Sequence, residues 1–476
     1  MTLPAFRDTI LAATDAGTLR DGLIGENILI PGLNGDVPLV YADYVASGRA
    51  LRQVEDFIAT HVLPFYANSH TEASFCGAHM TRLRRAARAE ISRIVGAGEN
   101  DKVIFAGSGA TAGLNRLVSL FGVNEARSPA VFIGPYEHHS NILPWRESKA
   151  KVVEIPEARH GGVDIAALAE ALAEHAESDL KIGSFSAASN VTGVITDTGP
   201  VTRLLKAHGA LSVWDYAGAG PYLPIDMADG AQARKDAVVV SPHKFPGGPG
   251  ASGVLVVNQS ALRRTTPSWP GGGTVSFVSP WRHDYSADLA SREEAGTPNV
   301  IGDIRAALAF IVKDAVGTDA IAASEARFNR MALEGWRGNP HLELLGADHP
   351  HRLPIFSFRV RDAKGAPVHQ QLFTRMLSDV YGIQARGGCA CAGPYAHRLL
   401  QIGEAESTAL HRELAEGREL RKPGWVRLNF SYMMDDRTAR FIIDSVNALS
   451  RTTEDYAPRY AVDSATARFK PMSRVA

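Results

Sequence analysis

Short apolar runs alternate with stretches of helical character through the N-terminal half of the chain. The runs cover residues 103–105, 131–133, 152–155, 182–185, 211–214, 238–240 and 254–257. Continuous apolar runs of this length fit strands that are buried on both faces, and the stretches between them can supply crossover helices. The sequence therefore predicts an α/β fold with a mostly parallel sheet that is covered by helices on both sides.

Two of the connecting helices can be placed from the residue pattern. The stretch from Leu83 to Ile94 carries apolar residues at helical spacing, and its arginines fall on the remaining surface of the helix. Such arginines usually form a solvated face. Asp164 stands where a helix N-cap is expected, ahead of Leu168 and Leu172.

The chain has 476 residues, which is enough for more than one hydrophobic core, so we expect two domains. Residues 41–302 are expected to form the larger domain and residues 303–450 a smaller C-terminal α+β domain, entered through a helix over 304–316. Residues 1–40 are expected to pack with the smaller domain. Residues 451–476 are expected to extend over the surface or across a dimer interface.

The charge balance excludes two kinds of partner. With 50 basic and 51 acidic residues, the chain has no general attraction for nucleic acid or for an anionic membrane surface. No apolar run approaches the length needed to span a bilayer, and the N-terminus lacks a basic segment followed by an apolar one. We therefore expect a cytoplasmic protein.

The 3 cysteines are too few and too unevenly spaced for a disulfide framework. Cys389 and Cys391 form a Cys-x-Cys pair, which lacks the second half of a zinc site, so no metal is expected. The thiols are expected to be reduced.

Lys244 lies in the segment Ser241-Pro-His-Lys-Phe-Pro-Gly-Gly-Pro-Gly250, between two of the apolar runs. A lysine at such a junction is largely desolvated, which favours the neutral amine and suits it to form a Schiff base. Asp215 ends the preceding apolar run and could serve as the acidic partner of a pyridinium nitrogen. Either residue alone is a weak signal, because most lysines in glycine-rich turns are solvated surface residues.

Further segments strengthen this pattern. In chain order they are Tyr41-Ala-Asp-Tyr-Val-Ala-Ser47, Gly107-Ser-Gly-Ala-Thr111, Glu137-His-His-Ser-Asn141, Ser189-Asn-Val-Thr-Gly193, Gly271-Gly-Gly-Thr274, Arg292-Glu-Glu-Ala-Gly-Thr-Pro-Asn299, Arg386-Gly-Gly-Cys-Ala-Cys-Ala-Gly-Pro394 and Trp425-Val-Arg-Leu-Asn429. With Asp215 and Lys244 among them, the chain resembles the class V aminotransferase group of fold-type I pyridoxal-phosphate enzymes. Within that group it is similar to the cysteine desulfurases and selenocysteine lyases, from about Tyr41 to Ala448.

The resemblance implies pyridoxal 5'-phosphate as the cofactor and a large domain that binds it. The residues expected to hold it are Ala110, Thr111, His138, Asn190, Asp215, Ser241, His243, Lys244 and Thr274. Of these, His138 would stack on the ring and shuttle a proton, and Lys244 would carry the cofactor. Thr274 would contact the phosphate of a neighbouring subunit, so a homodimer is expected.

For the substrate, the resemblance implies an amino acid whose carboxylate is bound by Arg427 or Arg386. Arg427 lies in an apolar strand, where an unpaired charge is costly, so a partner for it is expected. The family register selects Cys391 over Cys389 as the nucleophile that takes sulfur from L-cysteine as a persulfide and leaves L-alanine. A sulfur-acceptor protein is a possible partner.

Two departures from the family pattern leave the substrate open. The chain reads Asp215-Tyr-Ala-Gly218 where many desulfurases have a glutamine at the end, and it carries a charged insert around residues 404–422. The alternative function is another class V enzyme, an aminotransferase or a β-eliminating lyase that acts on a different amino acid. A third hypothesis is a non-catalytic scaffold with the same fold. The sequence also leaves open whether the enzyme prefers cysteine or selenocysteine.

Overall fold

The computed structural model describes residues 1–68, 72–228, 233–389 and 391–472. The chain divides into two compact units. The large unit contains residues 1–24, 46–188 and 195–321. The small unit contains residues 25–45, 189–194 and 322–476.

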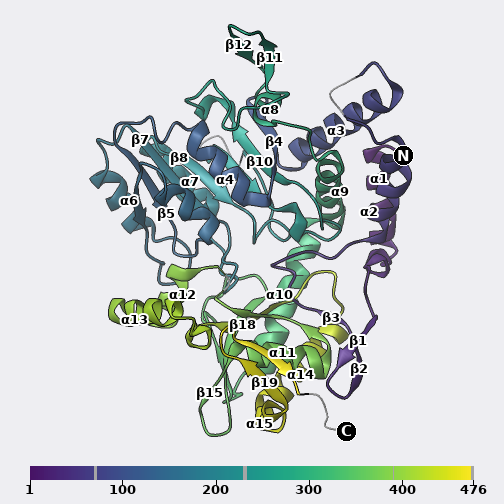
Figure 1. Ribbon diagram of the computed structural model, residues 1–476, viewed down its shortest axis with the longest axis vertical. Coiled ribbons are helices and arrows are strands. Elements are labelled where there is room, and N and C mark those ends of the chain that lie inside the picture. Colours follow the sequence, from purple (N-terminus) through teal and green to yellow (C-terminus); the bar gives the residue numbers. More distant parts are fainter. Residues whose placement is uncertain (69–71, 229–232, 390, 473–476) are drawn as a thin grey trace. The chain divides into compact units, whose positions relative to one another are not determined.

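The large unit is built on a seven-stranded sheet with the order β4-β10-β9-β8-β7-β5-β6 (Figure 1). The strands are β4 (Asp101–Gly107), β5 (Pro129–Ile133), β6 (Lys151–Glu154), β7 (Leu180–Ser186), β8 (Leu211–Asp215), β9 (Ala237–Val240) and β10 (Gly253–Asn258). Strands β5 to β9 are parallel, and β10 is antiparallel to both β4 and β9. The predicted α/β fold with a mostly parallel sheet is confirmed.

The large unit also contains helices, several of which pack their apolar faces on this sheet. The helices of the unit are α1 (Leu3–Asp15), α2 (Arg52–Phe57), α3 (Phe75–Ile94), α4 (Gly109–Leu120), α5 (Leu143–Arg146), α6 (Ile165–Glu174), α7 (Thr198–Ala207), α8 (Leu289–Glu293) and α9 (Val300–Val316). Leu114 and Leu117 of α4 pack in one core cluster with Val239 and Leu255 of the sheet. The expected N-cap is also present, since the Asp164 carboxylate accepts the N–H groups of Ala166 and Ala167.

The small unit contains an antiparallel sheet with the strand order β13-β14-β18-β17. These strands are β13 (Leu342–Leu344), β14 (Ile355–Arg361), β17 (Arg386–Gly388) and β18 (Trp425–Asn429), with β15 (Pro367–Val368) beside β14. The neighbouring helices are α10 (Thr318–Trp336), α11 (Gln370–Tyr381), α12 (Gly393–Leu399), α13 (Glu404–Ala415) and α14 (Asp436–Arg451). Trp336 packs against Phe356, Phe358 and Phe430 to form an aromatic core.

Short ribbons complete both units. In the small unit, β3 (Val40–Tyr41) pairs with β16 (Ile383–Gln384), β1 (Leu29–Gly32) with β2 (Gly35–Pro38), and β19 (Tyr460–Asp463) with β20 (Arg468–Pro471) after α15 (Thr453–Tyr456). In the large unit, β11 (Val275–Val278) and β12 (His283–Tyr285) form a hairpin that projects from the unit (Figure 1). Within the described residues, no helix combines the length and the apolar character that a membrane-spanning segment needs.

Candidate active site

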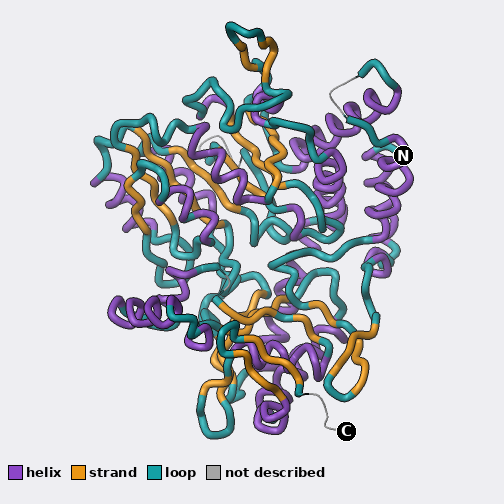
Figure 2. The backbone as a smooth tube through the Cα atoms, in the orientation of Figure 1, coloured by secondary structure: helices purple, strands orange, loops and turns teal. Residues whose placement is uncertain are grey.

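Several predicted residues of the large unit lie at or just beyond the carboxyl ends of its strands. Figure 2 shows how the strands of this sheet lead into loops. Asp215 is the last residue of β8, and Lys244 ends a short 3-10 helix (Pro242–Lys244) that follows β9. Ala110 and Thr111 begin α4 directly after β4. Because the carboxyl ends of parallel strands meet at one edge of a sheet, residues far apart in the sequence come together there.

The start of α4 forms a tight cradle that fits a phosphate group. The Ser241 hydroxyl accepts a hydrogen bond from the Ala110 N–H at 2.9 Å. Gly109 has a φ of +64°, and a Cβ at that position would lie 2.7 Å from Ser241 Oγ and 3.1 Å from His243 Cε1. The side chain of Ser108, the N-cap residue, makes no hydrogen bond to the N–H groups of the first turn. N–H groups at such a helix start bind anions well, so this region could hold a phosphate group.

His138 is connected to the same region through side-chain hydrogen bonds. The hydroxyls of Thr111 and Ser140 lie 2.7 Å apart. Ser140 in turn contacts His138 Nδ1, by its hydroxyl at 3.0 Å and by its N–H at 3.1 Å. The structure therefore links Thr111 and His138, and Ser140 is a connecting residue to which the sequence analysis gave no role.

Asp215 has the environment expected for the partner of a cationic ring nitrogen. Its side chain is buried, and one carboxylate oxygen accepts the Ala217 N–H at 2.7 Å. Burial raises the pKa of the Asp215 carboxyl, whereas the Ala217 N–H and the positive charge of Lys244 act in the opposite direction. A buried carboxylate of this kind is stabilised by a cation, so Asp215 can keep a pyridinium nitrogen protonated.

His243 is expected to act as a neutral hydrogen-bonding group. Burial and the charge of Lys244 lower the pKa of His243 to about 4. At neutral pH the imidazole is therefore uncharged, and it can contribute a hydrogen bond but no positive charge to a phosphate.

A buried network around Glu137 anchors the loop that carries His138. The Glu137 carboxylate accepts the Ser186 N–H at 2.9 Å and the Ser186 hydroxyl at 2.7 Å, and it also accepts the Asn141 side-chain amide. The Asn141 side-chain oxygen accepts the Trp145 indole N–H at 3.1 Å. Burial raises the pKa of Glu137 to about 7. The sequence contains Glu137 in a recognised segment, but only the folded structure shows that it ties this loop to β7.

Among the described residues, the Thr274 hydroxyl makes no hydrogen bond to the residues of the phosphate cradle. Its side chain is buried, and its hydroxyl donates to the Gly271 carbonyl at 2.7 Å. In the described part of the chain, the hydrogen bonds of this hydroxyl stay inside the loop 271–274.

In the small unit, Arg386 and Arg427 face each other across β17 and β18, where they occupy paired positions. Asp43, which follows β3, accepts hydrogen bonds from Arg427 Nη2 at 3.0 Å and from Arg386 Nε at 3.0 Å. Asn190 contributes its backbone carbonyl, which accepts Arg427 Nη1 at 3.1 Å. Burial lowers the pKa of Arg427, and Asp43 opposes that effect. Asp43 is thus the partner that the sequence requires for Arg427 but does not identify.

The two C-terminal cysteines follow β17. Cys391 is exposed and Cys389 is half-buried. Cys391 has a φ of 55°, and its thiol group slightly opposes the lowering of the pKa of Arg427 by burial. Of the two thiols, Cys391 is the more accessible to a substrate.

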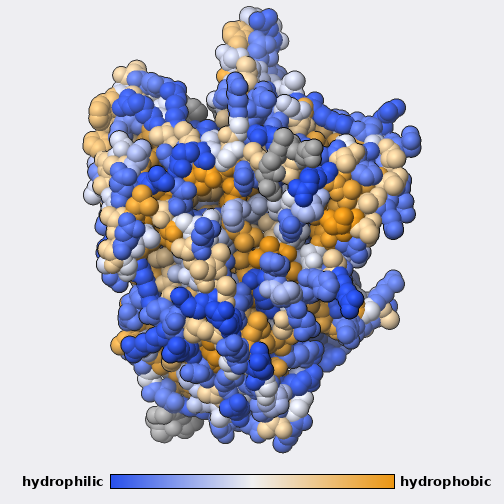
Figure 3. Space-filling model, turned by 180° about the vertical axis from the view of Figure 1, so that it is seen from behind, coloured by the Kyte–Doolittle hydropathy of each residue, from blue (hydrophilic) through white to orange (hydrophobic). Residues whose placement is uncertain are grey.

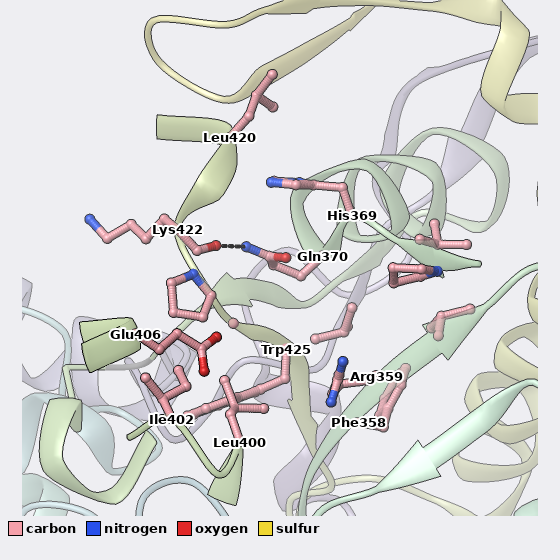
Figure 4. A pocket seen from close by; sticks show the side chains of 16 residues that line it. Phe358, Arg359, His369, Gln370, Leu400, Ile402, Glu406, Leu420, Lys422 and Trp425 are labelled. Carbon is pink, nitrogen blue, oxygen red and sulfur yellow. Dashed lines mark hydrogen bonds between the residues drawn. The ribbon is translucent and has the colours of Figure 1, made fainter. Parts of the chain in front are cut away.

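The charged insert forms one wall of a cavity of about 280 Å³ in the small unit (Figure 4). Leu400, Ile402, Glu406 and Lys422 line it together with Trp425. The Lys422 carbonyl accepts a hydrogen bond from the side chain of Gln370 at 3.1 Å, and Figure 4 shows this bond. The insert is therefore bonded to the start of α11, and it shares this cavity with Trp425 of β18, two residues before Arg427.

Comparison with known proteins identifies the class to which this fold and these residues belong. A model of the aminotransferase class-V family matches residues 40–411. The chain therefore belongs to the class-V aminotransferase family, whose members are enzymes that depend on pyridoxal phosphate.

Individual relatives point to one branch of that family. A cysteine desulfurase of Salmonella agona is 31% identical over 369 residues, which cover 76% of this chain and 86% of that protein. A probable cysteine desulfurase of Halalkalibacterium halodurans is 27% identical over 374 residues, covering 77% and 88%.

Two solved structures share the fold. An apo cysteine desulfurase of Thermococcus onnurineus superimposes with a TM-score of 0.71 at 21% identity, covering 87% of this chain and 94% of that one. The S-sulfonic acid form of the cysteine desulfurase CsdA from Escherichia coli gives a TM-score of 0.66 at 21% identity, covering 86% and 94%.

Lys244→Ala tests the cofactor site of the large unit. We expect this variant to lose the visible absorption of bound pyridoxal phosphate and all turnover, because it lacks the amine that would bind the aldehyde carbon of the cofactor. Lys102→Ala is the matched control, since Lys102 is a surface lysine of the same unit that donates to the Glu99 carbonyl. Cofactor that can still be fixed to Lys244→Ala by borohydride would contradict the assignment.

Proposed function

We propose that this chain is a pyridoxal-phosphate-dependent cysteine desulfurase that converts L-cysteine to L-alanine and takes the sulfur onto Cys391. The observation that carries the proposal is the grouping in the small unit of an exposed Cys391 with Arg427 and Arg386. A cysteine sulfur is the nucleophile that persulfide formation requires, and arginines suit an amino-acid carboxylate. The named cysteine desulfurases among the relatives support the same function.

The large unit would hold the cofactor with residues that fit its parts. Gly109, Ala110 and Ser241 would bind the phosphate, Asp215 the ring nitrogen, and Lys244 the aldehyde carbon. When bound, pyridoxal phosphate supplies an electron-withdrawing ring that stabilises negative charge at the α-carbon of an amino acid. Thr111 and His243 are assigned to the phosphate.

The remaining roles belong to side chains of this chain. Arg386 and Arg427 would orient the substrate carboxylate. The Cys391 thiolate would attack the substrate sulfur, so that an S–S bond forms while the bond between Cβ and sulfur breaks. The electron pair of the broken bond stays with Cβ, which takes up a proton to give alanine, and Cys391 keeps the sulfur as a persulfide. We assign proton transfer to His138, and we propose that an acceptor protein removes the persulfide sulfur.

We also propose that the enzyme is a homodimer in which the loop 271–274 reaches the phosphate of the other subunit. The hairpin that follows this loop exposes Phe277, Val278 and Trp281, the last to 89%. Figure 3 shows both apolar and polar atoms on the projecting hairpin. An isolated two-stranded hairpin is marginally stable in water, and exposed apolar groups of this kind mark an interaction surface. A second copy of the chain would cover them.

Thr274→Val tests the contribution across the dimer. We expect cofactor affinity to fall by about tenfold, the effect of losing one hydrogen bond to a charged group. The dimer and the fold should persist. Thr202→Val is the matched control, because the buried Thr202 hydroxyl accepts the Trp214 indole N–H at 2.9 Å within the same unit. That variant should lose stability but keep its cofactor affinity. A fully active monomer at working concentration would contradict the proposal.

Cys391→Ser tests the chemistry. The variant should bind cofactor and L-cysteine as the parent does but release no alanine, because a serine hydroxyl is a poor nucleophile toward sulfur. Cys389→Ser, the matched control two residues away, should lose much less activity. Mass spectrometry after one turnover of the parent should find one added sulfur on the peptide that contains Cys391. If both serine variants turn over as fast as the parent, the aminotransferase or β-lyase alternative takes the place of desulfuration.

A further inference from the structure

Asp43 joins the two arginines of the small unit into one charged cluster. Its two carboxylate oxygens are used separately, one by Arg427 and the other by Arg386, each at 3.0 Å. Asp43 is 8% exposed and Arg427 is 3% exposed, so their charges are held largely out of water. Buried charges interact more strongly than surface charges because solvent screens them less.

The two guanidinium groups differ in the nitrogen atoms that they can offer to a ligand. Arg427 donates from Nη1 to the Asn190 carbonyl and from Nη2 to the Asp43 carboxylate. Its remaining Nε is buried and has no hydrogen-bond partner among the described residues. Arg386 gives only Nε to Asp43, and its side chain is 52% exposed. Its terminal nitrogens make no bond to the described part of the chain, so they can receive a carboxylate as a fork.

The cluster carries a net charge of +1, from two arginines and one aspartate. A single carboxylate neutralises this charge. A second carboxylate on the ligand would be placed near the negative Asp43 without a free cation to receive it.

We propose that Asp43 is a specificity-determining residue: it orients Arg386 through Nε and sets the net charge of the cluster, so that the site selects amino acids with one carboxylate over those with two. The inference rests on the proposed function only in taking an amino acid as the substrate. Asp43 is a positioning residue in this scheme, because it acts through the arginines.

A purely structural role makes a different prediction. If Asp43 only neutralised a buried arginine, its removal would lower the stability of the fold and would weaken the binding of all amino acids equally. The selectivity between a monocarboxylate and a dicarboxylate therefore separates the two roles.

The test uses Asp43→Asn in the cofactor-loaded full chain, with L-alanine and L-aspartate as probes in calorimetric titrations. In the parent, L-alanine should bind more tightly. In Asp43→Asn, the ratio of the L-alanine to the L-aspartate affinity should fall by about tenfold or more, because the cluster gains one unit of positive charge. Asp43→Glu should restore the parent ratio.

Asp379→Asn is the matched control. Asp379 is a buried aspartate of the same unit that pairs with Arg375 Nε at 2.7 Å. Its loss should lower the thermal midpoint in a similar way but leave the affinity ratio unchanged. Arg386→Gln covers the case in which Asp43→Asn does not fold, since this exposed side chain can be replaced without loss of the core. Arg386→Gln should lower the affinity for L-alanine by about tenfold or more.

An unchanged affinity ratio in Asp43→Asn, or undiminished binding of L-alanine by Arg386→Gln, would overturn the inference. The outcome is separable from the proposed function. A chain that shows the selectivity shift but transfers no sulfur to Cys391 would keep the role of Asp43 and lose the desulfurase reaction.

Discussion

The carboxyl edge of the parallel sheet is the constraint on which the large unit depends. Strands β4, β5, β8 and β9 all lead into residues expected to bind the cofactor, from Ala110 after β4 to Lys244 after β9. Parallel strands buried on both faces leave their ends as the place where polar side chains can converge. The close approach at Gly109, where a Cβ would strike Ser241, shows how tightly α4 is held against this edge.

In the small unit, the structure around the site depends on the pairing of a buried charge. Arg427 lies in a strand whose residues are all buried, and an unpaired guanidinium there would be strongly destabilising. Asp43 and the Asn190 carbonyl accept hydrogen bonds from its two terminal nitrogens, and the same carboxylate accepts one from Arg386 Nε. The cost of burying one charge therefore accounts for contacts among four segments that are distant in the sequence, at residues 43, 190, 386 and 427.

The sequence predicts the strands of the large sheet and the Asp164 cap because those features depend on local pattern. The expectation of a partner for Arg427 follows from burial alone, but Asp43 is 384 positions away in the sequence and no periodicity connects the two. Glu137 illustrates the same limit, since its network depends on Ser186 of β7. The roles of Asn190, Thr274 and Cys391 come from resemblance, because a turn, a loop and an exposed thiol carry no local signal of their chemistry.

The central claim is that this chain removes sulfur from L-cysteine rather than transferring or eliminating its amino group. The most direct measurement is to incubate the purified, cofactor-loaded protein with L-cysteine and a reductant, with and without a 2-oxo acid, and to quantify alanine, sulfide and pyruvate. Our account predicts alanine and sulfide in equal amounts, independent of the 2-oxo acid. Pyruvate with ammonia, or amino-group transfer that requires the 2-oxo acid, would contradict it.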